Sequence, residues 1–363
     1  MSSRRLKPPW VLGLAALAVS IAVARRSTAA EGTVKVFIYA GQSNAQGKAP
    51  IAIAEAQAEA PATKDLYKHL RKDGKWIVRD DVFFRYAAQG PQGTQGPLRI
   101  GMGSWRFGAD HEFASMMGDH FEEQVVISKS AFGGSSLCQH FRPPSAGYPA
   151  NLQKQLDDAK NRVKANNERN RKNDPLPAMD DIKKTYGVLY RQILTDYRGL
   201  SENAGTLFPE LKGKKPELAG FVWFQGWNDQ YGGQDEYASN LKHFIKDMRK
   251  DLGAPNLPFV IVAMGQNGST PAAGALLTIR EAQMAMNDVP EFRGNVKAFR
   301  ADLLVDRDAE SLWTSKDPAI RSREVKEHKF AADDGYHYYG SPIWYMRIGR
   351  AAGEAMLELC KKK

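Results

Sequence analysis

The chain has 363 residues, of which 42% are hydrophobic and 25% are charged, and this balance excludes a disordered or low-complexity protein. The length suits one large domain or two small ones. The formal net charge is +10, but residues 1–30 contribute five basic and no acidic side chains. The rest carries 46 basic and 41 acidic residues, a mild excess that requires no nucleic-acid partner.

The first 30 residues have the three parts of a secretory signal peptide. Arg4, Arg5 and Lys7 precede an apolar run over residues 10–24, and small residues follow at 27–30. The run is shorter than the roughly 20 residues that cross a bilayer, which favours a cleaved signal over a membrane anchor. We therefore expect export to the periplasm or the extracellular space, without stable membrane insertion after cleavage.

Two cysteines, Cys138 and Cys360, lie far apart in the sequence. An oxidising compartment would allow them to pair. A core of this size does not need a disulfide, so we expect two buried thiols instead. The C-x-x-C spacing of metal sites is absent, and we expect no metal or other cofactor.

Apolar runs of strand length alternate with amphipathic segments along the rest of the chain. Strands are predicted over residues 34–40, 76–78, 82–84, 124–128, 218–224, 259–263 and 296–299, and helices over residues 51–70, 112–120, 186–197, 237–252, 276–287 and 345–359. Strands that are apolar on both faces and alternate with helices predict an α/β fold with a covered parallel sheet. We expect one domain over residues 31–363, with a charged helical insertion around residues 150–180.

The first predicted strand delivers a serine to the edge of this sheet. Residues 36–40 are apolar, Gly41 ends the run, and Gln42, Ser43 and Asn44 suit a tight turn. Ligands of open α/β sheets bind at the carboxyl ends of the strands. A serine placed there becomes a nucleophile if a base, an orienting carboxylate and oxyanion donors converge on it.

A base and a carboxylate follow near the carboxyl terminus, in the sequence Asp334-Gly335-Tyr336-His337. A carboxylate three residues before a histidine in one loop can accept a hydrogen bond from imidazole Nδ1, which leaves Nε2 free as a base. The chain therefore predicts a triad of Ser43, Asp334 and His337.

Candidate oxyanion donors follow three of the predicted strands. They are the backbone N–H of Ser43, the backbone N–H of Gly134, and a side-chain amide from Gln225 or Asn228. Gly134 lies in a loop where the lack of a side chain lets the amide approach a ligand. Loss of one such donor typically costs about 3 kcal/mol in the reaction barrier, so convergence of these loops would matter for acyl transfer.

Four motifs together resemble the SGNH/GDSL hydrolase superfamily. They are G-Q-S-N at 41–44, K-S-A-F-G-G-S-S-L at 129–137, W-F-Q-G-W-N-D at 223–229 and D-G-Y-H at 334–337. Within the superfamily they are most similar to the sialate O-acetylesterase and carbohydrate esterase family 6 branch. The resemblance implies a three-layer αβα sandwich of flavodoxin-like type and metal-free deacetylation of carbohydrates. Its substrate would be an acetylated oligo- or polysaccharide.

The resemblance also assigns roles to single residues. It implies that Ser43 is the nucleophile, Gly134 the glycine of the second block, Asp334 the acid and His337 the base. The third block of this branch usually reads W-x-Q-G-E, with the glutamine as an oxyanion donor. Trp227 replaces the glutamate here, and the block instead matches the G-x-N-D of the wider superfamily. We favour Gln225 as the donor, with Asn228 as the alternative.

Competing interpretations remain for several residues. Ser135 and Ser136 are alternative nucleophiles, and His328 is an alternative base. His111 and Glu112 would either touch substrate or serve the start of a helix.

Three weaker candidates for substrate binding are Gln42, Trp227 and Arg142. Trp227 is a candidate cleft wall, and Arg142 would meet an acidic sugar or form a salt bridge. For the whole protein, the alternatives to a carbohydrate acetylesterase are a general short-chain esterase or lipase of the same superfamily, and a non-catalytic carbohydrate-binding protein.

Overall fold

The computed structural model describes residues 32–87, 94–102, 106–319 and 333–361, so the predicted signal peptide and His328 lie outside the described residues. The main sheet consists of β1 (Thr33–Gly41), β5 (Val82–Tyr86), β6 (Thr94–Pro97), β8 (Val125–Ala131), β9 (Lys215–Phe224), β10 (Phe259–Ala263) and β11 (Val296–Arg300). Two small ribbons pair β2 (Ala49–Pro50) with β7 (Arg106–Phe107) and β3 (Arg71–Lys72) with β4 (Lys75–Trp76).

The strands of the main sheet lie in the order β11-β10-β9-β1-β8-β5-β6. Every neighbouring pair is parallel except β5 with β6. The predicted parallel sheet is confirmed. In the flavodoxin order the first strand lies between the second and third. Here β1 lies between β8 and β9. The second strand of the main sheet in chain order, β5, lies on the far side of β8 from β1.

The α-helices are α1 (Ser43–Gln46), α2 (Ile51–Glu59), α3 (Ala109–His120), α4 (Leu152–Asn170), α5 (Met179–Lys184), α6 (Val188–Leu207), α7 (Tyr237–Asp251), α8 (Gly274–Met284), α9 (Arg307–Trp313) and α11 (Pro342–Lys361). Short 3₁₀ helices include η1 (Lys64–Leu70), η5 (Trp227–Tyr231) and η10 (Gly335–Gly340). Within the described ranges, no helix has both the length and the apolarity to span a membrane.

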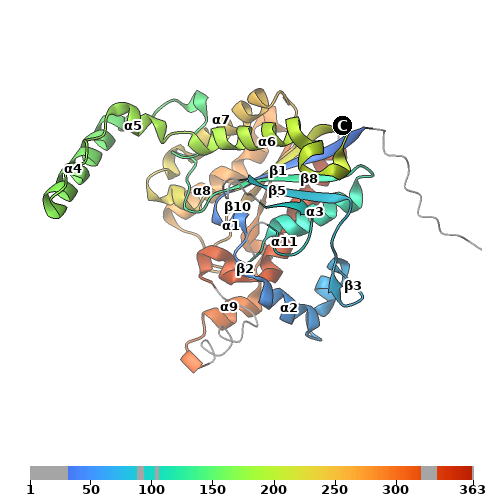
Figure 1. Ribbon diagram of the computed structural model, residues 1–363. Helices are drawn as coiled ribbons and strands as arrows, with labels where there is room; N and C mark the ends of the chain where they lie inside the picture. Colours follow the sequence, from blue (N-terminus) through green and yellow to red (C-terminus); the bar gives the residue numbers. More distant parts are fainter. Residues whose placement is uncertain (1–31, 88–93, 103–105, 320–332, 362–363) are drawn as a thin grey trace, which may run out of the picture.

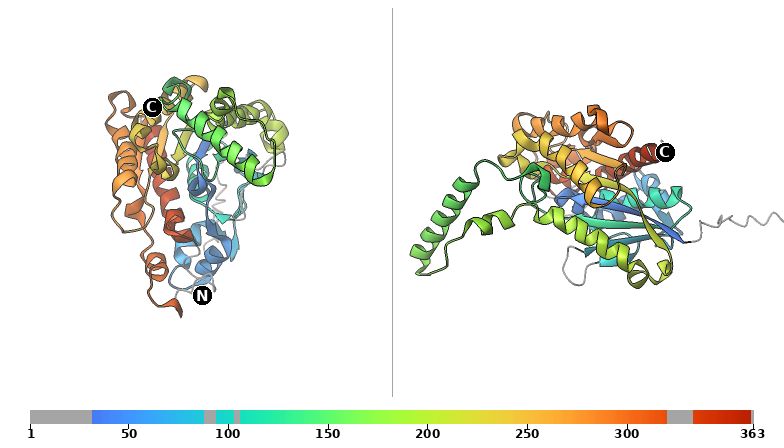
Figure 2. Two further views of the ribbon diagram at one scale, coloured as in Figure 1. Left: turned by 90° about the vertical axis from the view of Figure 1, so that its left-hand side faces the viewer. Right: turned by 90° about the horizontal axis from the view of Figure 1, so that it is seen from above.

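The two faces of the sheet are covered by different helices, which gives three layers (Figures 1 and 2). Alternate residues of β1 point to opposite faces. Phe37 and Tyr39 join a core with side chains of α3 and α11, whereas Ile38 and Ala40 join a core with side chains of α6, α7 and α8. The predicted αβα sandwich is therefore confirmed, and burial on both faces explains the continuous apolar runs in the strands.

The register of the central strands sets the position of the candidate site. Gly41, the last residue of β1, pairs with Ala131 at the end of β8 and with Phe224 at the end of β9. The three loops that follow these strands therefore leave the sheet side by side. They carry Ser43, the glycines of the second motif, and the third motif.

The charged segment predicted around residues 150–180 forms α4 and α5, which project from the body of the protein (Figures 1 and 2). Leu156 is the single buried residue of α4, and α5 has none. Such a helix pair is solvated along most of its length, as its charge pattern indicates.

Candidate active site

Ser43 is the first residue of the short helix α1, directly after β1. Gly41 makes this turn possible, because its φ is 154° and a Cβ there would collide with the backbone oxygen of Phe224. The backbone N–H of Gln42 donates to the same oxygen at 3.2 Å. The N–H of Ser43 lies in the first turn of a helix, where an amide has no intrahelical acceptor.

The structure brings Ser43 and His337 into contact although 294 positions separate them. His337 Nε2 lies 3.0 Å from Ser43 Oγ, and His337 Nδ1 lies 3.0 Å from Asp333 Oδ2. A carboxylate on Nδ1 fixes the tautomer in which Nε2 can accept a proton. Hydroxyl, imidazole and carboxylate thus form one hydrogen-bonded chain.

The carboxylate in this chain is Asp333, which corrects the prediction of Asp334. Asp334 is the residue before η10, where its backbone oxygen accepts the N–H of His337 at 2.8 Å. Its backbone N–H donates to Asp333 Oδ1 at 2.8 Å. A hydrogen bond with the Asp334 carboxylate raises the pKa of Tyr336, so this side chain serves its neighbour rather than the imidazole.

Asp333 is held in its ionised form. Partial burial by itself would raise the pKa of this carboxyl. Hydrogen bonds from His337 and from the Asp334 backbone, together with the charges of His337 and Arg106, outweigh burial and hold the pKa below its usual value. Arg106 Nη1 lies 3.8 Å from Asp333 Oδ2. An ionised Asp333 stabilises the imidazolium that forms when His337 takes a proton.

The loop that presents His337 contains two residues in the left-handed region. Tyr338 has φ 55° and Tyr339 has φ 56°, a conformation that bulky side chains seldom adopt. Packing compensates for it: Tyr338 is fully buried, lies 4.7 Å from the Trp344 ring and accepts the Gly265 N–H at 3.3 Å. The surroundings therefore over-determine this turn, as is common at functional sites.

The loop after β8 lies against the serine. A Cβ built on Gly133 would be 4.0 Å from Ser43 Cβ, and Gly133 and Gly134 are both exposed. Gly134 has φ 71° and no heavy atom within 4 Å of the place where a Cβ would be. The space on that side of the Gly134 α-carbon is therefore open to a ligand.

Gln225 is placed differently from the prediction. Its Nε2 donates to Asp229 Oδ2 at 2.7 Å, and also lies 3.2 Å from Gln42 Oε1 and from Ser135 O. Its Oε1 accepts the Tyr237 hydroxyl at 3.1 Å. The amide is buried and committed to these partners, so it does not point an N–H at Ser43. Gln225 is a structural residue here, not an oxyanion donor.

Asn228 has an amide that remains available. Its Oδ1 accepts Gln42 Nε2 at 3.0 Å, which orients the group, and its Nδ2 has no hydrogen-bond partner among the described residues. Gln42 is 2% exposed and also accepts the Gly226 N–H at 3.0 Å. Gln42 therefore positions the third motif rather than facing a substrate, which corrects its assignment to substrate binding.

Asp229, which the sequence analysis missed, joins two of the loops. It is fully buried, and its carboxylate accepts the backbone N–H groups of Leu137 and Cys138, both at 2.8 Å. Burial raises the pKa of Asp229, although these bonds and the one from Gln225 act in the opposite direction. Asp229 is the last residue of the W-F-Q-G-W-N-D motif, and its place in that motif was the sequence signal for this role.

Asn44 is a second residue that the sequence analysis passed over. Its Nδ2 donates to the backbone oxygen of Tyr336 at 2.9 Å, and its Oδ1 accepts the Tyr345 hydroxyl at 2.6 Å. Asn44 thereby ties the nucleophile turn to the histidine loop and to α11. Asn44 is the last residue of the G-Q-S-N motif, and its place in that motif was the sequence signal for this role.

An aromatic pair flanks the imidazole. The ring of Tyr336 lies 4.5 Å from that of His337 and 5.6 Å from that of Trp227. Tyr336 is 37% exposed, and Trp227 is partly exposed. Trp227 thus lies against Tyr336, which is the aromatic neighbour of the base.

Two other serines have different partners. Ser135 Oγ donates to Phe132 O at 2.6 Å, and Ser136 Oγ lies 3.2 Å from His140 Nδ1. That nitrogen also accepts the Ser136 N–H at 3.1 Å, and no carboxylate among the described residues orients the ring. Neither serine has the three-part arrangement found at Ser43.

Arg142, proposed from sequence as a substrate contact, is 6% exposed. Its guanidinium bonds the oxygens of Cys138 and Gly147 and forms an ion pair with Glu236 at 2.9 Å. These partners make it a structural residue, which was the other interpretation of this residue.

The remaining candidates are also buried or paired. Glu112 is fully buried, 2.7 Å from His69 and 2.9 Å from Arg350. His111 is buried in α3, and neither of its ring nitrogens has a hydrogen-bond partner among the described residues. Cys138 and Cys360 are partly buried thiols that no disulfide joins. In the described part of the chain, no three His, Cys, Asp or Glu side chains gather in a way that could hold a metal ion.

The fold and the site define an α/β protein in which a serine at the carboxyl edge of a parallel sheet contacts a histidine. Comparison with known proteins relates it to a family of enzymes. Residues 179–311 match the family described as "carbohydrate esterase, sialic acid-specific acetylesterase". This match confirms the resemblance drawn from the four motifs, and the matching family is one of ester hydrolases.

Individual relatives are more distant. The "Probable carbohydrate esterase At4g34215" of Arabidopsis thaliana is 33% identical over 72 residues, which is 19% of this chain and 26% of that protein. The solved structure of the same Arabidopsis protein has a TM-score of 0.49 at 14% identity, with 89% of this chain and 97% of that one covered. A carbohydrate acetylesterase from Xanthomonas citri has a TM-score of 0.47 at 14% identity, with 92% and 57% covered.

Proposed function

We propose that this protein is an exported serine esterase that hydrolyses O-acetyl esters of carbohydrates. The observation that carries the proposal is the hydrogen-bonded chain from Ser43 Oγ through His337 to Asp333. The matching family is described as one of carbohydrate esterases, which supports an acetylated sugar as the substrate class. The amino-terminal sequence supports export.

The reaction begins when Ser43 Oγ attacks the acetyl carbonyl and His337 Nε2 accepts its proton. The developing oxyanion accepts hydrogen bonds from the backbone N–H groups of Ser43 and Gly134 and from Asn228 Nδ2. His337 then protonates the departing sugar hydroxyl, which leaves an acetyl group on Ser43. Water, deprotonated by His337, attacks this acyl-enzyme and releases acetate. Asp333 remains ionised throughout and stabilises the imidazolium.

The aromatic pair supports a sugar on the leaving-group side. Tyr336 lies next to the imidazole that must protonate the sugar hydroxyl, and Trp227 extends the aromatic surface on the other side of Tyr336. Flat aromatic surfaces suit the apolar C–H face of a pyranose. We therefore assign these two rings to the sugar unit that carries the ester.

Ser43→Ala tests the chemistry. We expect turnover of p-nitrophenyl acetate to fall by at least three orders of magnitude, because the acyl-enzyme cannot form. Near-wild-type turnover, with the variant folded, would end the proposal. Covalent labelling of wild-type protein by a fluorophosphonate, absent in Ser43→Ala, separates an active esterase from a non-catalytic carbohydrate-binding protein.

Substrate choice needs a separate comparison. Acetate release from acetylated xylan and from O-acetylated sialic acid would identify the sugar class. Rates on p-nitrophenyl esters of increasing chain length distinguish a carbohydrate acetylesterase from a general short-chain esterase or lipase. We expect acetyl to be the preferred acyl group, and a preference for longer chains would favour the lipase-like alternative.

A further inference from the structure

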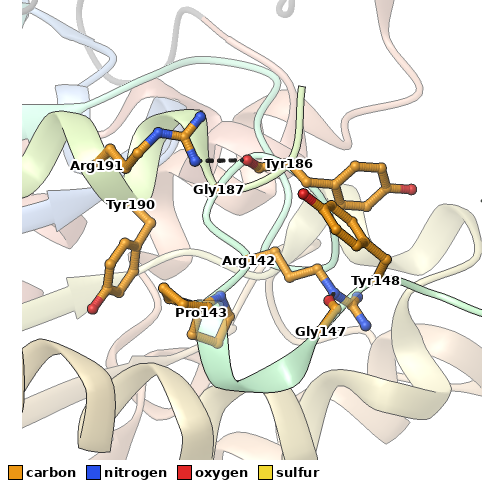
Figure 3. A pocket seen from close by; sticks show the side chains of 9 residues that line it. Arg142, Pro143, Gly147, Tyr148, Tyr186, Gly187, Tyr190 and Arg191 are labelled. Atoms are coloured by element: carbon orange, nitrogen blue, oxygen red, sulfur yellow. Dashed lines mark hydrogen bonds between the residues drawn. The ribbon is translucent and has the colours of Figure 1, made fainter. Parts of the chain in front are cut away.

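A second cavity, of about 240 Å³, lies between the loop after β8 and the start of α6 (Figure 3). Arg142, Pro143 and Tyr148 line it from the loop, and Tyr186, Gly187 and Arg191 line it from the other side. None of its lining residues belongs to the Ser43 site. The volume is below the roughly 300 Å³ at which drug-sized pockets begin, so it suits one small ring.

The walls of the cavity are aromatic and partly open. Tyr148 is 54% exposed, its ring meets that of Tyr186 edge-on at 5.8 Å, and Lys183 Nζ lies 5.6 Å from its centre. Pro143 adds a further apolar surface. Surfaces of this kind pack against the C–H face of a pyranose while the sugar hydroxyls remain at the rim.

Hydrogen-bonding groups stand beside these walls. The Tyr148 hydroxyl has no partner among the described residues, and Arg191 is exposed. Arg191 donates from Nη1 to Tyr186 O at 3.0 Å (Figure 3) and from Nη2 to Lys184 O at 3.5 Å, and the rest of its five N–H donors are left for a ligand. The charge of Arg142, by contrast, is neutralised by Glu236. Arg191, together with Lys183 whose Nζ lies 5.6 Å from the centre of the Tyr148 ring, therefore offers charged donors to the hydroxyl groups of a ligand.

The cavity is preformed. The backbone N–H groups of Gly187 and Leu189 donate to the oxygens of Gln139 and His140, both at 2.8 Å. The Tyr186 hydroxyl is fixed by Gln155 at 2.7 Å. A site held by backbone hydrogen bonds loses little conformational entropy when it binds a ligand.

We propose that this cavity is an accessory saccharide site that binds a single pyranose unit of a carbohydrate chain. The inference rests on the proposed function, because a polymer held here would bring further acetyl esters to Ser43 by raising their local concentration. The loop that lines the cavity is continuous with the glycine loop beside Ser43. Arg142 Nη1 bonds Cys138 O at 2.9 Å, and Cys138 N–H bonds Asp229, so the two parts are firmly connected.

The test uses binding and turnover separately. Calorimetric titration of Ser43→Ala protein with xylohexaose and with 3′-sialyllactose measures saccharide binding without hydrolysis. We expect at least one to bind, and Tyr148→Ala in the same background to weaken that binding about ten-fold. Arg191→Gln should weaken it as well. Leu176→Ala, at an exposed apolar residue outside the cavity, is the matched control and should bind like the parent.

In the active protein, Tyr148→Ala should raise KM for acetylated xylan several-fold while kcat/KM for p-nitrophenyl acetate stays unchanged. Binding of neither saccharide, or affinities that neither Tyr148→Ala nor Arg191→Gln alters, would overturn the accessory site. Such a result would leave the esterase proposal intact, because that proposal depends on Ser43→Ala and p-nitrophenyl acetate. If wild-type protein had no esterase activity but still bound a saccharide in a Tyr148-dependent way, the accessory site would stand and the esterase proposal would fail.

Discussion

Asn44 and Tyr336 are hydrogen-bonded at 2.9 Å, and each is the chain neighbour of a residue of the proposed catalytic pair. Asn44 follows Ser43, and Tyr336 precedes His337. The Tyr345 hydroxyl fixes the Asn44 amide from α11 at 2.6 Å. The distance between nucleophile and base is therefore set by a separate contact behind them, within a buried part of the protein.

Asn44→Ala should lower kcat while KM for p-nitrophenyl acetate changes little. Without the amide, the histidine loop loses its tie to the serine turn, and a misplacement of about 1 Å can cost roughly 100-fold in rate. The buried Tyr345 hydroxyl also loses its nearer acceptor, so we expect unfolding to be easier by about 1–3 kcal/mol. Steady-state kinetics and urea unfolding measure the two effects.

Tyr345→Phe is the conservative companion to this change. It removes the hydroxyl that orients Asn44 but keeps the bond from Asn44 to Tyr336, so its effect on kcat should be smaller. Equal losses in both variants, or an unchanged kcat in Asn44→Ala, would contradict a positioning role for Asn44.

Asp333→Asn and Asp334→Asn form a matched pair on adjacent residues. Asp333→Asn should reduce kcat/KM by about four orders of magnitude, because an amide cannot hold the imidazole in the required tautomer or stabilise its charge. Asp334→Asn leaves the backbone oxygen that bonds His337 N–H in place, and we expect only a few-fold change. Kinetics on p-nitrophenyl acetate with both variants decides which aspartate serves His337, and the opposite ranking would reject Asp333.

Asn228→Ala should lower kcat by about 100- to 1000-fold with little change in thermal stability, because it removes an oxyanion donor from a partly exposed position.

Gln225→Ala should lower the stability of the protein rather than its turnover number. It removes one buried hydrogen-bond partner from Asp229 and one from the Tyr237 hydroxyl, and we expect a loss of about 1–3 kcal/mol in the free energy of unfolding. A stable Gln225 variant with strongly reduced kcat would restore Gln225 as the donor.

Sequence patterns predicted the fold well where both faces of an element are buried. The strand predicted over residues 259–263 coincides with β10, in which every residue is buried. The helix predicted over residues 51–70 instead ends at Glu59 and resumes as η1, because Pro61 restricts Ala60 to an extended conformation. Strand β6 was missed because its sequence, Thr-Gln-Gly-Pro, contains two residues that are rare in strands.

The sequence predicted which loops form the site but not which side chains within these loops contact one another. The motifs predicted that Ser43, Gly134 and His337 lie at the same edge of the sheet. Ser43 and Gly134 each follow a predicted strand, and His337 precedes the last predicted helix. The choice between Asp333 and Asp334 depends on how η10 begins, which spacing alone does not encode. The choice between Gln225 and Asn228 depends on Asp229, whose buried carboxylate binds the glutamine. Both distinctions arise from side-chain directions in loops rather than from the pattern of elements.

His111 gives a prediction for the dependence of stability on pH. Burial lowers the pKa of this imidazole to about 4, and both ring nitrogens lack a partner among the described residues. The unfolded chain binds a proton on His111 below its ordinary pKa of about 6.5, whereas the folded protein does so only below about 4. Stability is therefore lost as pH falls through this window, by about 2 kcal/mol at pH 5 relative to pH 8.

His111→Phe keeps a flat ring beside Phe107, which lies 5.5 Å away, and removes the titrating group. Urea unfolding at pH 8 and pH 5 should show that this variant loses about 2 kcal/mol less than wild type between the two values. His120→Phe, at an exposed position of the same helix, is the control and should retain the wild-type difference. If His111→Phe were as sensitive to acid as wild type, the buried imidazole would not be the group responsible.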